Sequence, residues 1–360
     1  MAASQHWIPH SASQLGREET KAAREVIEDN FVGSGPQAAE LEKEFCRRTG
    51  RKHAFAVSSG YNALSLAVRS LDLPPLSLIA LPTLTCSSVF AAVRGAGHRV
   101  WLTDIQDDDL TIDLASLPNE AAAIVAPHAY GAPVDVEKLM KSGRPWIEDC
   151  ATSPSALVND QPAGSFGTFA VFSFGSTKYL TGGSGGMLVT DDSSLAARVS
   201  DLLEFDRFEK NGDWRHGIPP ALPGRLSDLN ASVALVQWRR LAEFTQHRKQ
   251  IAGIYDNGLK KILSLKLPRL SEGHGFYRYI VYTQCEAASL AKELREHGVD
   301  ARHSVNAWLH HAAQTDQAIA GGPWPVAERW REHLLSLPIH PLMKTEDAHR
   351  VVDLMSSLLQ

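Results

Sequence analysis

The sequence predicts an α/β protein, in which a mixed, mostly parallel sheet carries helices on both faces, followed by a smaller C-terminal α+β domain. Between His53 and Thr190, short apolar runs alternate with helical patterns, which is typical of such a sheet. The length of 360 residues favours two domains. We place the boundary between residues 1–240, an N-terminal arm and large domain, and residues 241–360, the small domain.

Helical patterns open the chain. Residues 17–30 form an amphipathic pattern rich in Glu and Ala, which ends at Gly33-Ser34-Gly35-Pro36. A second helix is predicted to run to about Gly50, a residue suited to a helix C-cap. The apolar runs that follow predict strands at residues 53–58, 77–82, 98–103, 122–127, 145–149, 168–173 and 185–190.

The remaining chain begins with a polar segment. Asp206 to Gly224 is rich in Gly and Pro and is predicted to be a long loop. Long helical stretches are predicted over residues 227–262. The small domain is then predicted to contain strands near 276–283, a helix at 287–297 and a final helix from about Thr345.

Composition restricts the class of protein. A formal net charge of −5 and a pI of about 6.3 argue against nucleic acid or an anionic membrane as the main partner. No apolar run is long enough to span a bilayer, and the first residues lack the features of a signal peptide. The four cysteines are scattered without a C-x-x-C pair, so we expect neither structural zinc nor a disulfide framework. We expect a cytoplasmic location.

One lysine stands between two predicted strands. Lys178 follows the apolar run 168–173, has hydroxyl residues around it, and precedes a glycine-rich stretch, 182–186. Burial favours the neutral amine, a nucleophile that can form a Schiff base. The glycines allow the backbone to approach a bulky group. A solvated loop lysine is the plainer interpretation. Two features elsewhere in the sequence favour a lysine that forms a Schiff base.

These features are a carboxylate pair and a tight turn. A short apolar strand ends in Glu148 and Asp149, and residues 54–64 read as a strand, a small-residue turn and a helix. The N-terminus of a helix after such a turn can bind an anion. A phosphate site, a carboxylate and an amine are the groups needed to hold pyridoxal phosphate. Five polar residues fall near predicted strand ends, where ligands of such sheets bind: Ser59, Thr85, His128, Asp149 and Lys178.

Several short motifs occur in a fixed order along the chain. They are Ser59-Gly60 with Ala63-Leu64, Glu148-Asp149-x-Ala151, Ser173-Phe174-x-x-x-Lys178 with Gly183-x-Gly185-Gly186, Arg225-Leu226-Ser227-Asp228-Leu229, and Ser336-Leu337-Pro338-Ile339-His340-Pro341. Together they resemble the DegT/DnrJ/EryC1/StrS family of pyridoxal-phosphate sugar aminotransferases, over nearly the whole chain. The resemblance implies the aspartate-aminotransferase-like (type I) fold, with the cofactor bound by the large domain.

The resemblance implies roles for the two central residues. Lys178 would bind the cofactor's aldehyde and, once released, move a proton between the substrate carbon and the cofactor. Asp149 would lie against the pyridine nitrogen and keep it protonated. A helix N-cap is the alternative role for Asp149. Glu148 would point to the opposite side of the strand, and we interpret it as structural.

Four residues are candidates for the cofactor's phosphate: Gly60, Tyr61, Asn62 and Ser173. Ser173 matches the family position directly. Tyr61 keeps the backbone amide of the family's usual Thr but not its hydroxyl, and Asn62 can supply a substitute donor. The alternative for the whole turn is a plain connection between a strand and a helix.

Other positions depart from the family pattern. Cys86 stands where an aromatic ring or histidine usually covers the cofactor, and Thr152 replaces a Gln or His near its phenolic oxygen. Ser184 replaces the acid of G-E-G-G, and Pro223 replaces an Asn that contacts the neighbouring subunit's phosphate. Each change removes an interaction worth about 0.5–3 kcal/mol. We therefore expect an unusually held cofactor and an unusual substrate or reaction.

Three further features leave alternatives open. His128 either flanks the cofactor or is a satisfied core histidine. Arg225 and the loop around Trp214 are candidates for contacts across a dimer, although Arg225 can also be an ordinary surface residue. His310-His311 lacks carboxylates or cysteines at metal spacing, so we expect solvated histidines and no metal. The G-x-S-x-G match at 182–186 precedes a strand instead of the helix a hydrolase needs.

The predicted function is amino transfer by a homodimer. The donor would be an amino acid, glutamate or glutamine by the resemblance, and the acceptor a keto-sugar, typically nucleotide-linked, in amino-sugar, secondary-metabolite or surface-glycan biosynthesis. One alternative is another pyridoxal-phosphate reaction on the same fold: dehydration, decarboxylation or condensation. A second is a catalytically silent relative that acts as a regulator or binding partner, which the presence of Lys178 disfavours.

Overall fold

A computed structural model describes most of the 360 residues. The described residues are 6–204, 206–208, 212–216, 222–268, 271, 273–303, 305–314, 316–317 and 319–359, with the backbone alone described for 206–208 and 214–216. None of the described helices combines the length and apolar character that crossing a membrane requires.

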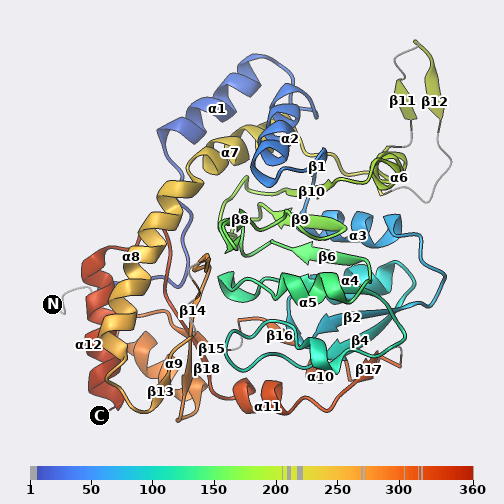
Figure 1. Ribbon diagram of the computed structural model, residues 1–360. Coiled ribbons are helices and arrows are strands. Elements are labelled where there is room, and N and C mark those ends of the chain that lie inside the picture. The colour runs from blue at the N-terminus through green and yellow to red at the C-terminus, as the bar shows by residue number, and fades with distance from the viewer. Residues whose placement is uncertain are drawn as a thin grey trace.

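The large domain is built on an eight-stranded sheet (Figure 1). In spatial order its strands are β1 (His53–Val57), β10 (Gly186–Thr190), β9 (Phe169–Ser173), β6 (Trp146–Asp149), β5 (Ala121–Pro127), β2 (Leu78–Pro82), β4 (Arg99–Thr103) and β17 (Ile319–Gly321). β10 pairs antiparallel with both neighbours, and the other pairs are parallel. The predicted mixed, mostly parallel sheet is confirmed, and each of the seven predicted strands lies within one residue of its expected bounds.

Helices cover both faces because apolar residues occupy alternate positions on both sides of the strands. On β9, Phe169 and Val171 join a core under α3 (Gly60–Ser70), α4 (Ser87–Gly95) and α6 (Ser193–Leu203). The intervening Ala170 and Phe172 join a core with α2 (Pro36–Thr49) and α7 (Asp228–Arg239). This two-faced burial is what a near-continuous apolar strand requires. A short helix, α5 (Val136–Lys141), packs over the same face as α2, against Trp146.

The predicted N-terminal helices form as α1 (Arg17–Glu28) and α2. Gly50 ends α2 in the left-handed conformation, with φ of 72°, as predicted for its C-cap. The predicted helical stretch at 227–262 forms as α7 and α8 (Leu241–Leu259). The prediction of a plain loop at 206–224 was wrong where the structure describes it, since β11 (Asp206–Phe208) pairs with β12 (Trp214–His216). Residues 205, 209–211 and 217–221 lie outside the described residues.

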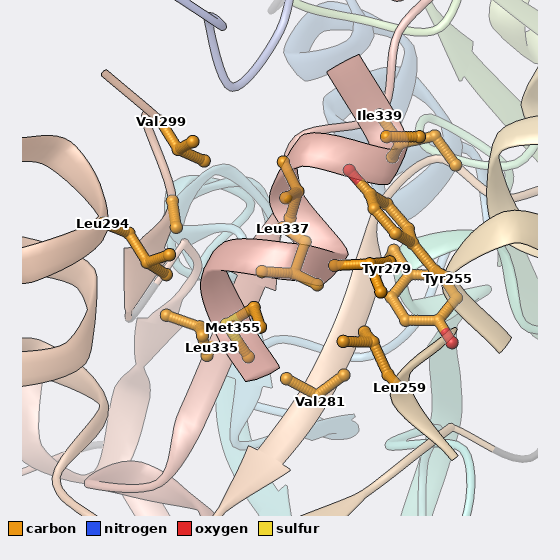
Figure 2. Packing of buried hydrophobic residues seen from close by; sticks show 14 of the residues in the cluster. Tyr255, Leu259, Tyr279, Val281, Leu294, Val299, Leu335, Leu337, Ile339 and Met355 are labelled. Atoms are coloured by element: carbon orange, nitrogen blue, oxygen red, sulfur yellow. The ribbon is translucent and has the colours of Figure 1, made fainter. Parts of the chain in front are cut away.

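The small domain has its own four-stranded sheet, in the order β13 (Leu265–Lys266), β14 (Tyr279–Thr283), β18 (Leu334–Leu337) and β15 (Arg302–His303). Helices α8, α9 (Ala287–Glu296) and α12 (Thr345–Leu359) pack against it, and α9 and α12 match their predicted positions. Figure 2 shows Leu335, Leu337 and Met355 packed between Leu294 and Tyr255. The hydroxyl of Tyr255 donates to the carbonyl of Pro338 at 2.7 Å, so its burial leaves no unpaired donor.

Segments of the chain cross between the domains in both directions. Ile8 bridges to Val299 and lies in the small-domain core. In the other direction, β17 returns to the edge of the large sheet, and β16 (Ala307–Trp308) pairs with β3 (Leu84–Thr85). Helix α10 (Leu309–Ala312) lies between β16 and β17 in the sequence, and α11 (Pro325–Arg331) follows β17. A division at residue 240, between α7 and α8, therefore leaves segments of each part built into the other.

Glu148 fixes the position of β6 within the sheet. Its carboxylate is fully buried, and it accepts hydrogen bonds from the backbone N–H groups of Gly164 (2.7 Å), Phe166 (3.0 Å) and Gly167 (3.0 Å). It also pairs with His128 Nε2 at 2.9 Å. Burial alone would raise the pKa of Glu148, but these hydrogen bonds lower it overall.

Removing this carboxylate should destabilise the fold. Glu148→Ala leaves several buried donors without an acceptor, and we expect it to lower the free energy of unfolding by about 3–5 kcal/mol. Glu137→Ala is the matched control, because Glu137 is exposed and paired only with exposed Lys141. Its effect should stay within about 0.5 kcal/mol. Urea unfolding measures both variants, and similar losses in the two would contradict the structural role of Glu148.

Candidate active site

A cleft of about 490 Å³ lies where the C-terminal ends of β6 and β9 face the small domain. Its wall includes seven of the residues singled out from the sequence: Gly60, Tyr61, Cys86, Asp149, Thr152, Ser173 and Lys178. The small domain and the N-terminal segment contribute residues that the sequence did not point to: His10, Tyr277, Arg278, Arg302 and Asn306. Ligand sites of open α/β sheets lie at this edge.

Asp149 ends β6 and presents its carboxylate to the cleft. It is 6% exposed, and one oxygen accepts a hydrogen bond from the backbone N–H of Ala151 at 3.0 Å. No ion pair to Asp149 occurs among the described residues. Burial raises the pKa of Asp149, while the Ala151 hydrogen bond and the nearby charge of Lys178 act in the opposite direction. Glu148 points away from the cleft, as the two-residue period of the strand predicts.

Lys178 is carried by a turn at the end of β9. Its backbone N–H donates to the carbonyl of Gly175 at 3.0 Å, and its side chain is half-buried on the cleft wall. The hydroxyl of Ser13 donates to the carbonyl of Ser176 at 2.8 Å. From the small domain, the hydroxyl of Tyr277 donates to the carbonyl of Thr177 at 3.1 Å. The turn that presents the lysine is thus held by segments far apart in sequence.

A helix N-terminus and a hydroxyl lie side by side at one end of the cleft. Ser59 caps α3, its hydroxyl accepting from the backbone N–H of Asn62 at 3.1 Å. Gly60 begins the helix, and a Cβ there would lie 2.7 Å from Cβ of Ser173. Only glycine allows this approach. Together, the amides at the start of α3 and the Ser173 hydroxyl suit an anion.

Four predicted cofactor contacts differ in what their side chains do. Tyr61 lines the cleft, and the residue is 47% exposed. Thr152 also lines it, but its hydroxyl donates to the carbonyl of His128 at 2.9 Å. Cys86 is exposed on the wall at the start of α4. The side chain of Asn62 lies off the cleft and donates to the Ser58 hydroxyl at 3.2 Å.

His128 and Arg225 lie away from the cleft wall. His128 is fully buried, with Nε2 against Glu148 and Nδ1 accepting from the backbone N–H of Val134 at 3.0 Å. Of the two interpretations of His128, the geometry matches the satisfied core histidine. Arg225 pairs with Glu204, and a contact across a dimer remains a prediction for it.

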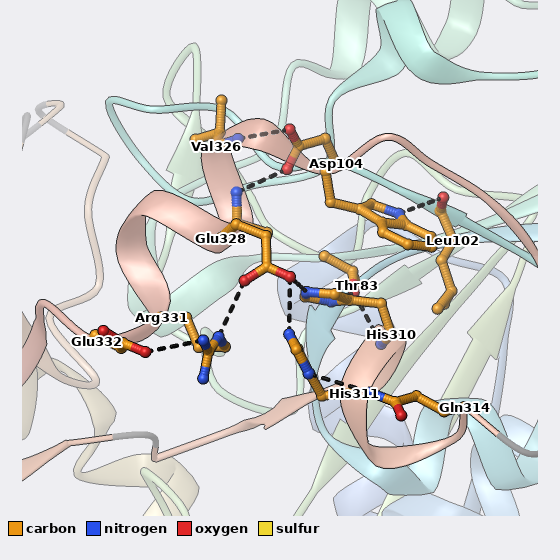
Figure 3. Close-up of polar contacts among 12 residues, drawn as sticks. Thr83, Leu102, Asp104, His310, His311, Gln314, Val326, Glu328, Arg331 and Glu332 are labelled. Carbon is orange, nitrogen blue, oxygen red and sulfur yellow. Dashed lines mark hydrogen bonds and ion pairs between the residues drawn. The ribbon is translucent and has the colours of Figure 1, made fainter.

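The expectation that both His310 and His311 are solvated was wrong for His310, which is buried. Both histidines contact Glu328 (Figure 3). Glu328 supplies a carboxylate that the sequence spacing did not reveal. It lies 3.2 Å from His310 Nε2 and 2.8 Å from His311 Nε2, and its other oxygen accepts from Arg331 at 3.0 Å. These atoms are close enough together to hold a metal ion. The arginine already neutralises Glu328, so we describe the group as an ion-pair network.

The residues of the cleft fit pyridoxal phosphate. Asp149 is a buried carboxylate without an ion-pair partner among the described residues, which suits a protonated ring nitrogen. The start of α3 and Ser173 suit a phosphate, and Lys178 offers an amine on the same wall. Asp149, Ser173 and Lys178 all line the cleft in this structure.

Comparisons with known proteins agree with this geometry. The chain matches the DegT/DnrJ/EryC1/StrS aminotransferase family over residues 13–356. It is 28% identical over 383 aligned positions to the spore coat polysaccharide biosynthesis protein SpsC of Bacillus subtilis, covering 99% of this chain and 98% of that protein. The aminotransferase TlmJ of Streptoalloteichus hindustanus superposes with a TM-score of 0.89 at 28% identity, covering 98% of this chain and all of TlmJ.

A second similar structure widens the range of chemistry found on this fold. It is a mutant of GDP-4-keto-6-deoxymannose-3-dehydratase (ColD) with bound GDP-perosamine. The TM-score is 0.90 at 19% identity, covering 97% of this chain and all of ColD. At that identity the likeness establishes the fold alone. The predicted aspartate-aminotransferase-like fold is confirmed by these structures.

The buried charge of Asp149 predicts a pH effect on stability. Folding raises the pKa of Asp149, so the folded state holds its proton more tightly than the unfolded state does. Stability is therefore expected to fall as pH rises from about 4, the ordinary pKa of an aspartate, through the higher folded pKa. Asp149→Asn should remove this loss, making the cofactor-free variant more stable than wild type at pH 7 but not at low pH.

Chemical unfolding at pH 3.5 to 8 measures the difference. Asp160→Asn, in the exposed turn between β7 (Leu157–Val158) and β8 (Gln161–Pro162), controls for the loss of one charge. An Asp149→Asn variant that is less stable than wild type by the same amount at every pH would contradict the account.

Proposed function

The chain belongs to the DegT/DnrJ/EryC1/StrS aminotransferase family, and we propose that it is a pyridoxal-phosphate-dependent aminotransferase that passes an amino group from an amino acid to a keto-sugar. The observation that carries the proposal is the meeting of Lys178 and Asp149 in one cleft, from the ends of adjacent parallel strands. A solitary lysine or a solitary buried carboxylate would carry little weight. Their combination with an anion site at α3 supports this cofactor.

Each side chain has a distinct task in the proposed reaction. When bound, pyridoxal phosphate supplies an electron-withdrawing ring that stabilises negative charge on the substrate carbon. The Lys178 amine attaches the cofactor and, when free, carries a proton on Nζ to and from that carbon. Asp149 remains ionised against the ring nitrogen and holds a proton there. The amides at the start of α3 and the Ser173 hydroxyl orient the phosphate.

The proposed substrates follow the family. Glutamate or glutamine would be the donor, and the acceptor a keto-sugar, typically nucleotide-linked, used for an amino-sugar, a secondary metabolite or a surface glycan. SpsC, a spore coat polysaccharide biosynthesis protein, supports the surface-glycan setting.

We further propose a homodimer in the cytoplasm. Three exposed apolar residues lie within six positions at and after the end of α1, namely Ile27 (58% exposed), Phe31 (51%) and Val32 (54%). Exposed apolar groups so close together favour an interface with a second copy. All four cysteines are unpaired, which suits a reducing compartment.

A different pyridoxal-phosphate reaction is the second candidate. The observation that favours it is that two residues departing from the family pattern bond to the protein's own backbone. The Thr152 hydroxyl donates to the carbonyl of His128, and the Ser184 hydroxyl donates to the carbonyl of Ser58 at 2.8 Å. Dehydration, decarboxylation or condensation would proceed without net transfer of nitrogen. Analysis of products formed in the absence of an amino donor distinguishes these reactions from transamination.

The first test is the visible absorbance of the purified protein with added pyridoxal phosphate. Wild type should develop the band of a lysine-bound cofactor, and Lys178→Ala should not, because it lacks the attaching amine. Lys292→Ala, at an exposed position of α9, should behave as wild type. Glutamate should then convert the wild-type spectrum to that of pyridoxamine phosphate, with one 2-oxoglutarate formed per site.

Two results would count against the proposal. A wild-type protein that never acquires the band would remove the enzyme interpretation and return the silent relative to consideration. A band that persists in Lys178→Ala would mean that another amine attaches the cofactor.

A further inference from the structure

Arg278 is a buried cation on the wall of the cleft. It precedes β14, is 7% exposed, and burial lowers the pKa of its guanidinium. Its side-chain hydrogen bonds go to one residue, from Nη1 to the Tyr277 carbonyl at 3.4 Å and from Nη2 to the Tyr277 hydroxyl at 3.2 Å. The guanidinium also lies over the Tyr277 ring, 4.1 Å from its centroid. No carboxylate of the described residues forms an ion pair with it.

Two other buried arginines show how this chain normally satisfies such a charge. Arg51 pairs with Asp191 at 2.7 Å and donates to two backbone carbonyls. Arg248 donates to three carbonyls, including that of Ile339 at 2.8 Å. Arg278 has neither arrangement within the described part of the chain. A buried charge without a partner is costly, so a site that keeps one generally serves a ligand of opposite charge.

The surroundings of Arg278 add positive charge. Arg302 and Arg295 share a single acid, Asp300, at 2.7 and 3.6 Å. His10 packs nearby, where burial and the charges of Arg278 and Arg302 lower its pKa to about 3, so it is neutral. Its Nε2 contacts the Ser336 hydroxyl at 2.8 Å, while its buried Nδ1 has no partner among the described residues. This end of the cleft therefore carries an excess of positive charge and an unused polar atom.

Arg278 is also close to the proposed reacting amine. Its Nη2 donates to the Tyr277 hydroxyl, which in turn donates to the carbonyl of Thr177, the residue before Lys178. Two hydrogen bonds thus connect the guanidinium to the backbone of the Lys178 turn. An anion bound by Arg278 would lie a short distance from the lysine.

We propose that Arg278 binds the carboxylate of the amino donor. This inference rests on the proposed function and adds the group that recognises the donor. The planar guanidinium matches a carboxylate with two parallel hydrogen bonds. In an amino acid the α-carboxylate is attached to the same carbon as the amine. Because the amine reacts where Lys178 attaches the cofactor, the binding site for the carboxylate must lie near Lys178. The phosphates of a nucleotide-sugar are separated from the reacting carbon by the sugar ring, which fits this position less well.

The test measures binding of succinate, an unreactive dicarboxylate, to the cofactor-loaded protein by calorimetry. Arg278→Met should weaken binding by about 30-fold or more, as loss of one partner of a buried charge pair does. Arg278→Lys should retain part of the affinity. Arg329→Met is the matched control, since that arginine is exposed, already paired with Asp107 and off the cleft wall, and its effect should stay below about threefold. Thermal melting of each variant establishes that it is folded.

A second arm identifies which substrate Arg278 serves. In wild type, replacing glutamate by its α-amide should lower the rate of the donor half-reaction strongly, and in Arg278→Met this difference should largely disappear. Binding of a nucleoside diphosphate should be the same in both proteins. Loss of nucleoside diphosphate binding with succinate binding kept would assign Arg278 to the acceptor and overturn the proposal.

Two further outcomes would overturn it. Equal succinate affinity in wild type and Arg278→Met would mean that the carboxylate is held elsewhere. An equal loss in Arg329→Met would point to general electrostatic attraction instead of a binding site at Arg278. If wild type never binds pyridoxal phosphate, the proposed function fails by itself, and succinate binding to the cofactor-free protein still tests Arg278.

Discussion

The site depends on one short turn, Gly175–Lys178, which is held from three directions. The sheet delivers it at the end of β9, the N-terminal segment binds it through Ser13, and the small domain binds it through Tyr277. The next residue, Tyr179, is buried under Arg248, whose guanidinium lies 4.4 Å from the ring centroid. The position of Lys178 is therefore a product of the contact between the two domains.

Two buried charges of opposite sign flank this turn. Asp149 and Arg278 each face the cleft, and neither forms an ion pair with another described residue. In a protein selected for stability alone, such charges would be paired or replaced, because burial of an unpaired charge is unfavourable. In the complex we propose, the missing partners are a protonated ring nitrogen for Asp149 and a carboxylate for Arg278. On this account the two unpaired charges lower the stability of the protein and raise its affinity for ligands that carry the two opposite groups. Stability and activity are known to conflict in this way.

The sequence was informative where local pattern determines structure. Apolar runs located the strands of the large sheet up to Thr190 because most of them are buried on both faces, and the motif residues Asp149, Ser173 and Lys178 lie at the ends of two of those strands. β17 was missed because Ile319–Gly321 is too short and small to show a pattern. His10 and Arg278 reach the cleft only through packing between distant segments. The sequence left the role of His128 open because residue spacing does not reveal burial, and the structure buries this side chain fully.

A crystal structure of the protein with pyridoxal phosphate and succinate tests the central claim most directly. The account predicts continuous density from Lys178 to the cofactor, the ring nitrogen within hydrogen-bonding distance of Asp149, and a carboxylate against Arg278. A cofactor bound with its ring nitrogen away from Asp149, or a cleft that admits neither molecule, would contradict the view that these two buried charges exist for their ligands.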